Sequence, residues 1–472
     1  MPRCQRLFVS LVATLALTER VCAAAEGDEA TAPTTAVAPT PELPLASEPP
    51  PGPRDPVAGV AGERVFLRSP GNEIVLLPSL RLEVGGAFFA RSQPPSGFTL
   101  RRARVELAGW MGPQFYFDLA GDFATGAEPL APNGTAPTDA YAAFAPAGDL
   151  FIVQAGRFDV PFSFENRTLE GYAPFLERSL VGRAIGAPFR KDVGVMVQGT
   201  DDARLVHYSA GLFNGDGPGF RNADDQIDVI GRVVVAPLAR SSFDSLRAVS
   251  IGGSAWYGQR AGAQPFVTQA TPGGFVVFEP AWTSNMPLAL RQNGPLLAVG
   301  GEVNVPIGNL FGVRGELFFK KQDLTEDSVG TMGASVMTLG RAKLQALGGY
   351  AEAYVWLLGD DRMLPRPGFE LPVRLGRVVE ATPQQGVTLA LRGEALKEDL
   401  TSTQTVLGDP NLATTRVLAG SGAVTYWYGR RVRASFIYGL TALKGTSENV
   451  KDSVANNGAY EHEVMVVVAM AL

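Results

Sequence analysis

The residues of this chain best suited to bind a solute are its cations, and several of them gather between Pro161 and Lys191. Fixed cations in a confined passage raise the local concentration of anions, and the planar fork of arginine matches phosphate oxygens. Glu165, Glu170 and Glu177 lie among them. The stretch therefore predicts a charged constriction with these candidate anion-lining residues: Arg167, Arg178, Arg183, Arg190 and Lys191.

Other chemistry has little support in the sequence. The chain has two cysteines and two histidines, His207 and His462, which are far apart and lack spaced acidic or cysteine partners. No phosphate-binding glycine loop or nucleophile motif is present in the sequence. We therefore expect no enzyme activity, no catalytic residues, no metal and no cofactor. The net charge of −6 argues against a nucleic-acid partner.

The first residues resemble an export signal. Arg3 and Arg6 precede an apolar run from Leu7 to Leu17, and alanines follow it. Residues 1–25 are therefore predicted to be a cleaved signal peptide, which would contain both cysteines. Residues 26–72 are rich in Ala, Pro and Thr in their first part, a composition that cannot bury enough apolar surface to fold. They are predicted to form a disordered linker.

From Glu73 onward, apolar and polar residues alternate in strand-length blocks. Tyr116, Asp118 and Asp122 interleave with Phe115 and Phe117, for example. Successive strand side chains point to opposite faces, so each block has one polar and one apolar side. The alternation predicts an all-β protein, a transmembrane antiparallel β-barrel over residues 73–472. The polar faces give these candidates for the lumen wall: Arg81, Arg102, Arg104, Arg314, Lys320, Arg392, Arg431 and Arg433.

The connections between blocks differ in length. The stretches Gln259 to Leu296, Asp323 to Gly340 and Asp360 to Leu371 are predicted to be long loops, whereas Gly112-Pro113 marks a tight turn. Long loops on one side and short turns on the other are typical of outer-membrane barrels. Pro161 cannot donate to a strand ladder, and Asp192 resumes the alternation, so the long segment between them is predicted to fold inward.

Aromatic residues near block ends predict rings at the level of lipid headgroups, although a packed core would use the same residues. They are Trp110, Trp256, Tyr257, Tyr354, Trp356 and Tyr426 to Tyr428. The last ten residues form one more apolar block, Glu463 to Leu472, which would close a barrel and leave no free edge.

The chain resembles the phosphate-selective porin O and P family over roughly residues 79–472. Three motifs carry the resemblance, together with Leu100 to Arg104, Asp139 to Tyr141 and Val424 to Tyr428. The motifs consist of Gly156, Phe158, Pro161 and Phe162; Phe175, Glu177, Arg178 and Ser179; and Arg190, Asp192 and Gly194. The resemblance implies a 16-stranded barrel that forms homotrimers in outer-membrane lipid. Counting blocks gives about 14 to 16 strands, as expected for such barrels.

The favoured function is an outer-membrane porin, a water-filled channel for passive diffusion of small hydrophilic solutes. Arginine and glutamate alternate on the predicted lumen faces, as at Arg392 and Glu394, so pairs could neutralise each other. We therefore weigh weak preference for anions such as phosphate equally with no selectivity, and place specific phosphate uptake behind both.

Two alternatives remain open from sequence. A secreted soluble all-β binding or structural protein would bury its apolar face, whereas a barrel turns that face to lipid. An enzyme or adhesin on a barrel scaffold would need a convergent cluster of titratable residues, and none stands out in the sequence.

Overall fold

A computed structural model describes most of the unit formed by residues 50–472. The described residues are 57–61, 64–90, 96–124, 136–168, 173–187, 190–217, 221–243, 246–265, 269–278, 288–328, 338–361, 385–402, 413–429, 431–445 and 459–471. The predicted signal peptide and most of the predicted linker lie outside them.

Strands make up nearly all of the regular structure, as the alternation predicts. The first ten are β1 Ala58–Ala61, β2 Arg64–Arg68, β3 Ile74–Phe89, β4 Gly97–Met111, β5 Phe115–Asp122, β6 Ala136–Phe144, β7 Ile152–Asp159, β8 Lys191–Thr200, β9 Val206–Phe213 and β10 Asp228–Val235. The rest are β11 Ser250–Pro265, β12 Gln269–Ala270, β13 Val276–Phe278, β14 Leu288–Ile307, β15 Phe311–Ser328, β16 Thr338–Leu358, β17 Gln385–Ser402, β18 Ala413–Tyr428, β19 Val432–Gly445 and β20 Ala459–Ala471. A 3₁₀ turn, Gly148–Leu150, and a π-helical turn, Gly182–Gly186, complete the described elements.

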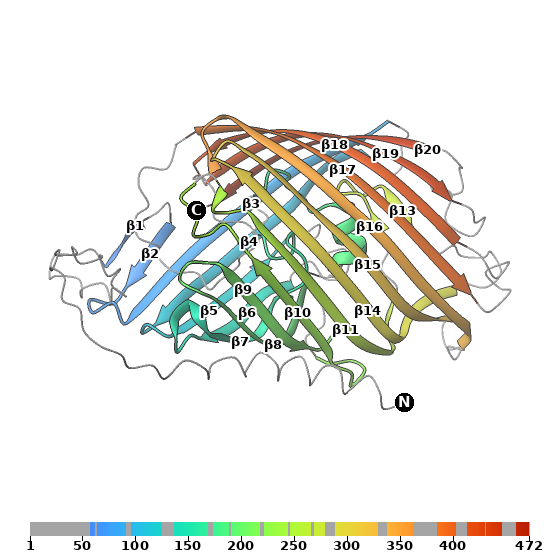
Figure 1. Cartoon of the computed structure of the whole chain (residues 1–472), viewed down its shortest axis with the longest axis horizontal. Helices are drawn as coiled ribbons and strands as arrows, with labels where there is room; N and C mark the ends of the chain where they lie inside the picture. Colours follow the sequence, from blue (N-terminus) through green and yellow to red (C-terminus); the bar gives the residue numbers. More distant parts are fainter. Residues whose placement is uncertain are drawn as a thin grey trace, which may run out of the picture. The chain divides into compact units, whose positions relative to one another are not determined.

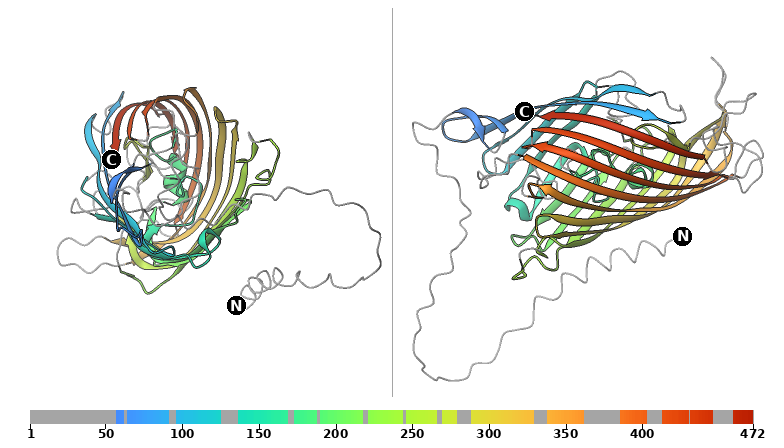
Figure 2. Two further views of the ribbon diagram at one scale, coloured as in Figure 1. Left: turned by 90° about the vertical axis from the view of Figure 1, so that its left-hand side faces the viewer. Right: turned by 90° about the horizontal axis from the view of Figure 1, so that it is seen from above.

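The main sheet closes on itself. Each strand from β3 onward pairs antiparallel with its neighbour, and β20 returns to pair with β3, where Val467 faces Gly85. Setting aside the β1–β2 hairpin and the separate β12–β13 hairpin, the wall has 16 strands (Figures 1 and 2). Closure leaves no unpaired edge. The predicted all-β barrel is confirmed, and its strand number is the one the family resemblance implies.

Side chains sort by parity along the strands. On β5, Tyr116 and Asp118 are buried while Phe115 and Leu119 are exposed. The outward positions are apolar, and large residues on them are widely exposed, as for Leu317 (61%), Leu391 (69%) and Leu418 (64%). A soluble sandwich would bury such residues, so this exposure argues against the soluble alternative.

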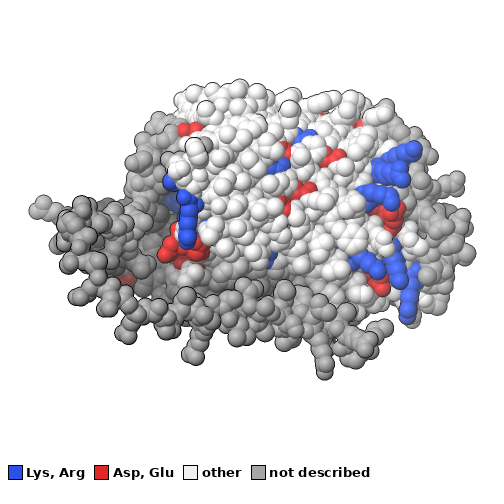
Figure 3. All heavy atoms as spheres, in the orientation of Figure 1, with Lys and Arg blue, Asp and Glu red and all other residues white. Residues whose placement is uncertain are grey.

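Most charged side chains that face outward lie toward the margins of the outer face. Figure 3 shows small scattered patches of charged atoms over the middle of the strands and a larger group of cations near one end of this face. Outward-facing Lys321, Lys343 and Lys397 are exposed and lie toward the ends of β15, β16 and β17 that meet the long connections. An apolar band bordered by charge is the pattern of a barrel surrounded by lipid.

Some boundaries differ from the sequence prediction. Residues 58–61 and 64–68, assigned to the linker, form the antiparallel pair β1–β2, and β2 joins the barrel through Leu67 opposite Leu76. The predicted loop Asp323 to Gly340 is wrong at both ends, because β15 continues to Ser328 and β16 begins at Thr338. Likewise, β11 extends to Pro265 and β14 begins at Leu288, which shortens the loop predicted from Gln259 to Leu296. Residue types that are common in turns occur inside these long strands. A prediction from residue types therefore placed the strand ends wrongly.

The prediction of interfacial aromatic rings was wrong for three tryptophans and for Tyr354, which are buried. Trp256, Trp356 and Trp427 are buried at 8%, 4% and 2% exposure and face the interior. Tyr257, Tyr426 and Tyr428 face outward and are exposed, consistent with the predicted interfacial position. Within the described residues, no helix combines the length and the apolar character needed to cross a membrane.

Candidate functional site

One chain segment crosses the interior of the barrel. It runs from Val160 to Arg190, between β7 and β8. Four of its backbone N–H groups donate to inward side chains of strands far away in the sequence, and one of them is Glu165 N, 3.1 Å from Glu316 Oε2. Ser163 N lies 3.3 Å from Ser254 Oγ on β11, Phe164 N 2.6 Å from Glu316 Oε1 on β15, and Val181 N 3.2 Å from Glu394 Oε2 on β17. The predicted inward fold of this segment therefore agrees with the structure.

Apolar residues of the crossing segment explain why it packs inside. Phe162 is fully buried and lies against Trp256 and Phe318, with ring centroids 5.8 Å and 6.1 Å away. Leu180 and Val181 join the same buried cluster. Burying such side chains stabilises the segment by about 1.5–3 kcal/mol each. The segment is therefore held by packing as well as by hydrogen bonds.

The base of the segment is an ion-pair network around Asp159. Arg190 binds both carboxylate oxygens of Asp159 at 2.8 Å and 2.9 Å. Lys191 Nζ lies 2.9 Å from Asp159 and 2.7 Å from Asp139. Arg167 donates to the Asp159 carbonyl at 2.8 Å and to Gln198 at 2.9 Å. These three predicted anion-lining cations are buried and fix the two ends of the segment to the wall.

The other two predicted cations differ. Arg178 donates to the carbonyl of Ala187 at 2.8 Å and is half-buried. Arg183 lies on the π-helical turn and is also half-buried, and its guanidinium makes no hydrogen bond or ion pair with the described part of the chain. Glu463 on β20 is near enough for the Arg183 charge to act on it.

The predicted lumen-wall cations are also mostly engaged. Arg314 and Arg392 both contact Glu352, at 2.6 Å and 2.7 Å, and Arg392 reaches Glu165 of the crossing segment at 3.3 Å. Arg433 lies over the Trp427 ring at 4.6 Å. These side chains face inward as predicted, but their charges are matched locally or held against a ring.

The predicted wall arginines on β3 and β4 are also paired with nearby carboxylates. Arg81 pairs with Glu83, Arg102 lies 3.3 Å from Glu83, and Arg104 pairs with Asp139. Arg431 is half-buried at the turn before β19. Lys320 is the exception, because it is 9% exposed and its ammonium makes no hydrogen bond or ion pair with the described residues.

Arg101 also faces the interior, although the alternation of side chains along this strand predicted that only Arg102 and Arg104 would. A register shift in the β3–β4 pairing, between Glu83 and Val84, lets both Arg101 and Arg102 reach inward groups. Arg101 pairs with Glu177 of the crossing segment. A bulge adds one residue to one strand and re-aims a side chain, and the alternating pattern gave no signal of it.

A second inward element was also missed. The β12–β13 hairpin reaches the opposite wall, where Gln269 donates to Glu398 at 2.7 Å and Thr271 to Glu463 at 2.6 Å. Phe275 and Val277 are buried in the cluster that contains Leu180. The two inward elements therefore share one apolar core inside the barrel. Only the partners on β17 and β20, far away in sequence, reveal this placement.

Among the described residues, one carboxyl group outside the barrel strands has a shifted pKa. Asp361 follows β16 and accepts hydrogen bonds from Trp356 Nε1 at 2.5 Å and Tyr354 Oη at 3.0 Å. Burial raises the pKa of this carboxyl, and the two donors lower it by a smaller amount. No group of His, Cys, Asp or Glu side chains in the described ranges has the arrangement of a metal site.

The fold and the interior define a β-barrel of the porin type. Residues 88–259 match the family described as phosphate-selective porin O and P, which confirms the resemblance predicted from the motifs around Gly156 and Arg190. No curated protein matches the sequence.

Several solved barrels are similar to this chain at low identity. OmpT of Vibrio cholerae in a trimer form has 8% identity and a TM-score of 0.47, covering 84% of this chain and 99% of its own. The outer-membrane channel DcaP of Acinetobacter baumannii has 7% identity and a TM-score of 0.46, covering 86% and 99%. An anion-selective porin from Comamonas acidovorans has 10% identity and a TM-score of 0.42, covering 85% and 100%.

Proposed function

We propose that this protein is an outer-membrane porin, a water-filled channel through which small hydrophilic solutes diffuse passively. The observation that carries the proposal is the sorting of side chains on a closed barrel. Charged groups such as Arg314 and Glu352 face inward, while Leu391 and Leu418 face outward and are widely exposed. A barrel of this pattern is stable in lipid and offers a polar route across it.

The charges support weak selectivity at most. A phosphate-selective channel would need several arginine forks free to bind the ion. Here Arg190, Arg314 and Arg392 are each paired with carboxylates inside the wall. Arg183 and Lys320 are left as candidate anion-attracting groups. We therefore propose weak anion preference or none, rather than specific phosphate uptake.

The remaining parts of the proposal follow from the family resemblance and the signal-like start of the sequence. The chain would be exported through a cleaved signal peptide and would assemble as a homotrimer in outer-membrane lipid. The crossing segment would set the narrowest point of each pore. No catalytic role is proposed for any residue.

Planar bilayers test the proposal directly. The purified full chain should produce stepwise increases in conductance, because each inserted barrel adds one open path. Heat-denatured protein at the same concentration is the matched control. Folded protein that inserts into bilayers without conducting ions would contradict the channel function. Extraction from the outer-membrane fraction without detergent would instead favour the soluble alternative.

A further inference from the structure

The β12–β13 hairpin lies inside the barrel but is not part of its wall. Its strands have two and three residues, and within the described residues they form a sheet of their own. Gln269 donates to Glu398 at 2.7 Å, and Thr271 donates to Glu463 at 2.6 Å. A two-stranded hairpin is marginally stable alone, so its place in the interior depends on such side-chain contacts.

The crossing segment is held more firmly than this hairpin. At its base Arg190 pairs with Asp159, and in its middle Glu165 lies 3.3 Å from Arg392 of the wall. The hairpin contacts its two carboxylates through an amide and a hydroxyl, which are neutral donors. Breaking a buried ion pair costs more than losing a hydrogen bond from a neutral donor. The hairpin is therefore the inward element that leaves the wall more easily.

The hairpin completes an apolar layer across part of the interior. Its Phe275 and Val277 are buried in this layer at 5% and 0% exposure. Every wall strand from β7 to β19 adds inward residues to it: Phe158, Met196, Phe213, Ile230, Trp256, Leu296, Phe318, Tyr350, Leu396, Val417 and Leu443. A hydrated solute does not cross a dry apolar constriction, so the docked hairpin blocks this part of the interior.

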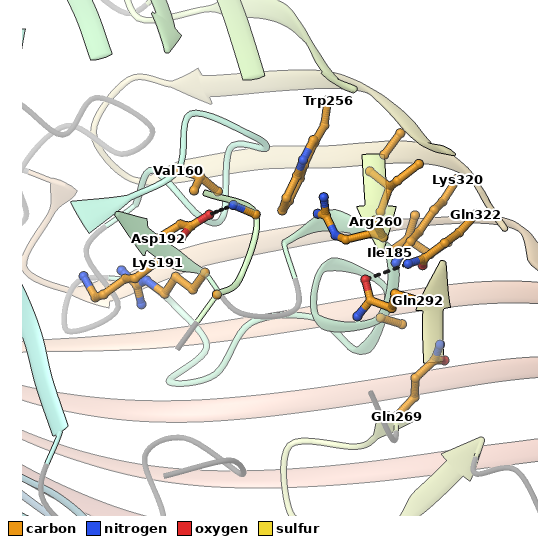
Figure 4. A pocket seen from close by; sticks show the side chains of 16 residues that line it. Val160, Ile185, Lys191, Asp192, Trp256, Arg260, Gln269, Gln292, Lys320 and Gln322 are labelled. Atoms are coloured by element: carbon orange, nitrogen blue, oxygen red, sulfur yellow. Dashed lines mark hydrogen bonds between the residues drawn. The ribbon is translucent and has the colours of Figure 1, made fainter. Parts of the chain in front are cut away.

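Two small cavities lie beside the hairpin, which lines both of them. Gln269 and Lys320 are among the residues around the first cavity (Figure 4). Thr271 and Glu463 are among those around the second. Each cavity has a volume of about 30 Å³, which is room for a few waters and not for a hydrated solute. With the hairpin docked, neither cavity offers a passage.

We propose that the β12–β13 hairpin is a plug, which closes the interior beside the crossing segment and opens it by undocking from Glu398 and Glu463. Undocking withdraws two apolar side chains from the layer and joins the two cavities into one wider space. The inference rests on the proposed channel function and adds to it a means of opening and closing the path.

Thiol labelling measures undocking without requiring conduction. Val277 on the hairpin and Val181 on the crossing segment are both 0% exposed in the same layer, so Val277→Cys and Val181→Cys form a matched pair. A water-soluble maleimide should label Val277→Cys about tenfold faster or more in the purified full chain, because a buried group reacts only when its element opens. Wild type, whose only cysteines are Cys4 and Cys22, gives the background.

A second substitution weakens the docking itself. Gln269→Met removes the donor to Glu398 and keeps the length of the side chain. It should speed the labelling of Val277→Cys about fivefold, the effect of one lost hydrogen bond, and leave Val181→Cys unchanged. The attached maleimide should keep the hairpin from docking again, so labelled Val277→Cys should show a higher mean conductance in planar bilayers than the unlabelled variant.

The outcomes separate the plug from the channel. Equal labelling of Val277→Cys and Val181→Cys, or labelling that leaves the conductance unchanged, would overturn the plug in a protein that still conducts. Preferential labelling of Val277→Cys in a protein that never conducts would support undocking and contradict the channel function. If Val277→Cys does not fold, as judged by heat-modifiable migration, Phe275→Cys replaces it with the same expected preference.

Discussion

The cations at the base of the crossing segment and those that face the interior space have different surroundings. Arg190 and Lys191 are buried and both contact Asp159, and Lys191 also contacts Asp139, at 2.7–2.9 Å. Arg183 and Lys320 make no direct ion pair with the described residues, although the charges of Glu463 and Glu398 act on them from further away. The difference teaches that the number of arginines near a pore is a poor measure of its affinity for anions. A cation already paired with a carboxylate holds the chain in place, whereas an unpaired one can act on a solute.

The base network should give the largest effect when broken. Arg190→Ala leaves Asp159 buried with Lys191 as its remaining cation, so the free energy of unfolding should fall by about 3 kcal/mol. Urea unfolding in detergent micelles measures this loss, with Arg183→Ala as the control that should unfold like wild type. If Arg190→Ala kept wild-type stability and changed ion selectivity instead, the base would be part of the pore lining.

The second prediction tests which side chains of a strand face the lumen and which face the lipid. Leu418 is 64% exposed on the outer face, and the adjacent Ala419 lines an interior pocket. Leu418→Arg should impair assembly, at a cost of up to about 2–4 kcal/mol, the value for an arginine at the bilayer midplane, whereas Ala419→Arg should assemble. Heat-modifiable migration in outer-membrane fractions reports assembly. Equal assembly of the two variants would contradict the assigned faces.

The third prediction isolates the free cation of the crossing segment. Arg183→Ala should change stability by no more than about 0.5 kcal/mol, because the side chain makes no hydrogen bond or direct ion pair with the described residues. It should lower the permeability ratio of anions to cations, since it removes a fixed charge beside the path. Lys343→Ala, which removes an exposed cation from the outer face, is the control and should leave that ratio unchanged.

The smallest expected effect concerns a carboxylate held by neutral donors. Burial raises the pKa of Asp361 above the value of an unfolded chain, so its protonated form favours the folded state. Its stabilising contribution is complete below about pH 4, the usual unfolded value, and is lost as the pH rises through the folded pKa. Wild type should therefore lose stability relative to Asp361→Asn across that range. A pH-independent difference in urea unfolding would refute the assignment.

Sequence reasoning predicted those features that depend on local alternation. The inward Tyr116 and Asp118, the outward Phe115 and Phe117, and the break at Pro161 all follow from period-two patterning and proline chemistry. The family resemblance supplied the strand number. These predictions depend on neighbours in sequence or on known motifs.

The rest depends on partners far away in the chain. The pairing of Arg190 with Asp159, the bulge that turns Arg101 inward and the docking of Gln269 on Glu398 need three-dimensional register. Lys320 makes no direct ion pair, because alanines at 298 and 346 face it from the adjacent strands and the next carboxylate of the row, Glu398, lies one strand further on. The sequence identified Lys320 as a wall residue but gave no sign of this arrangement.

The reversal potential in a salt gradient tests the central claim most directly. Wild type should be compared with the double variant Arg183→Ala, Lys320→Met in the same planar bilayers. If unpaired cations set the selectivity, the double variant should shift toward cation preference while retaining conductance, because the paired network remains intact. A wild-type reversal potential in the conducting double variant would contradict the account and return selectivity to the paired arginines.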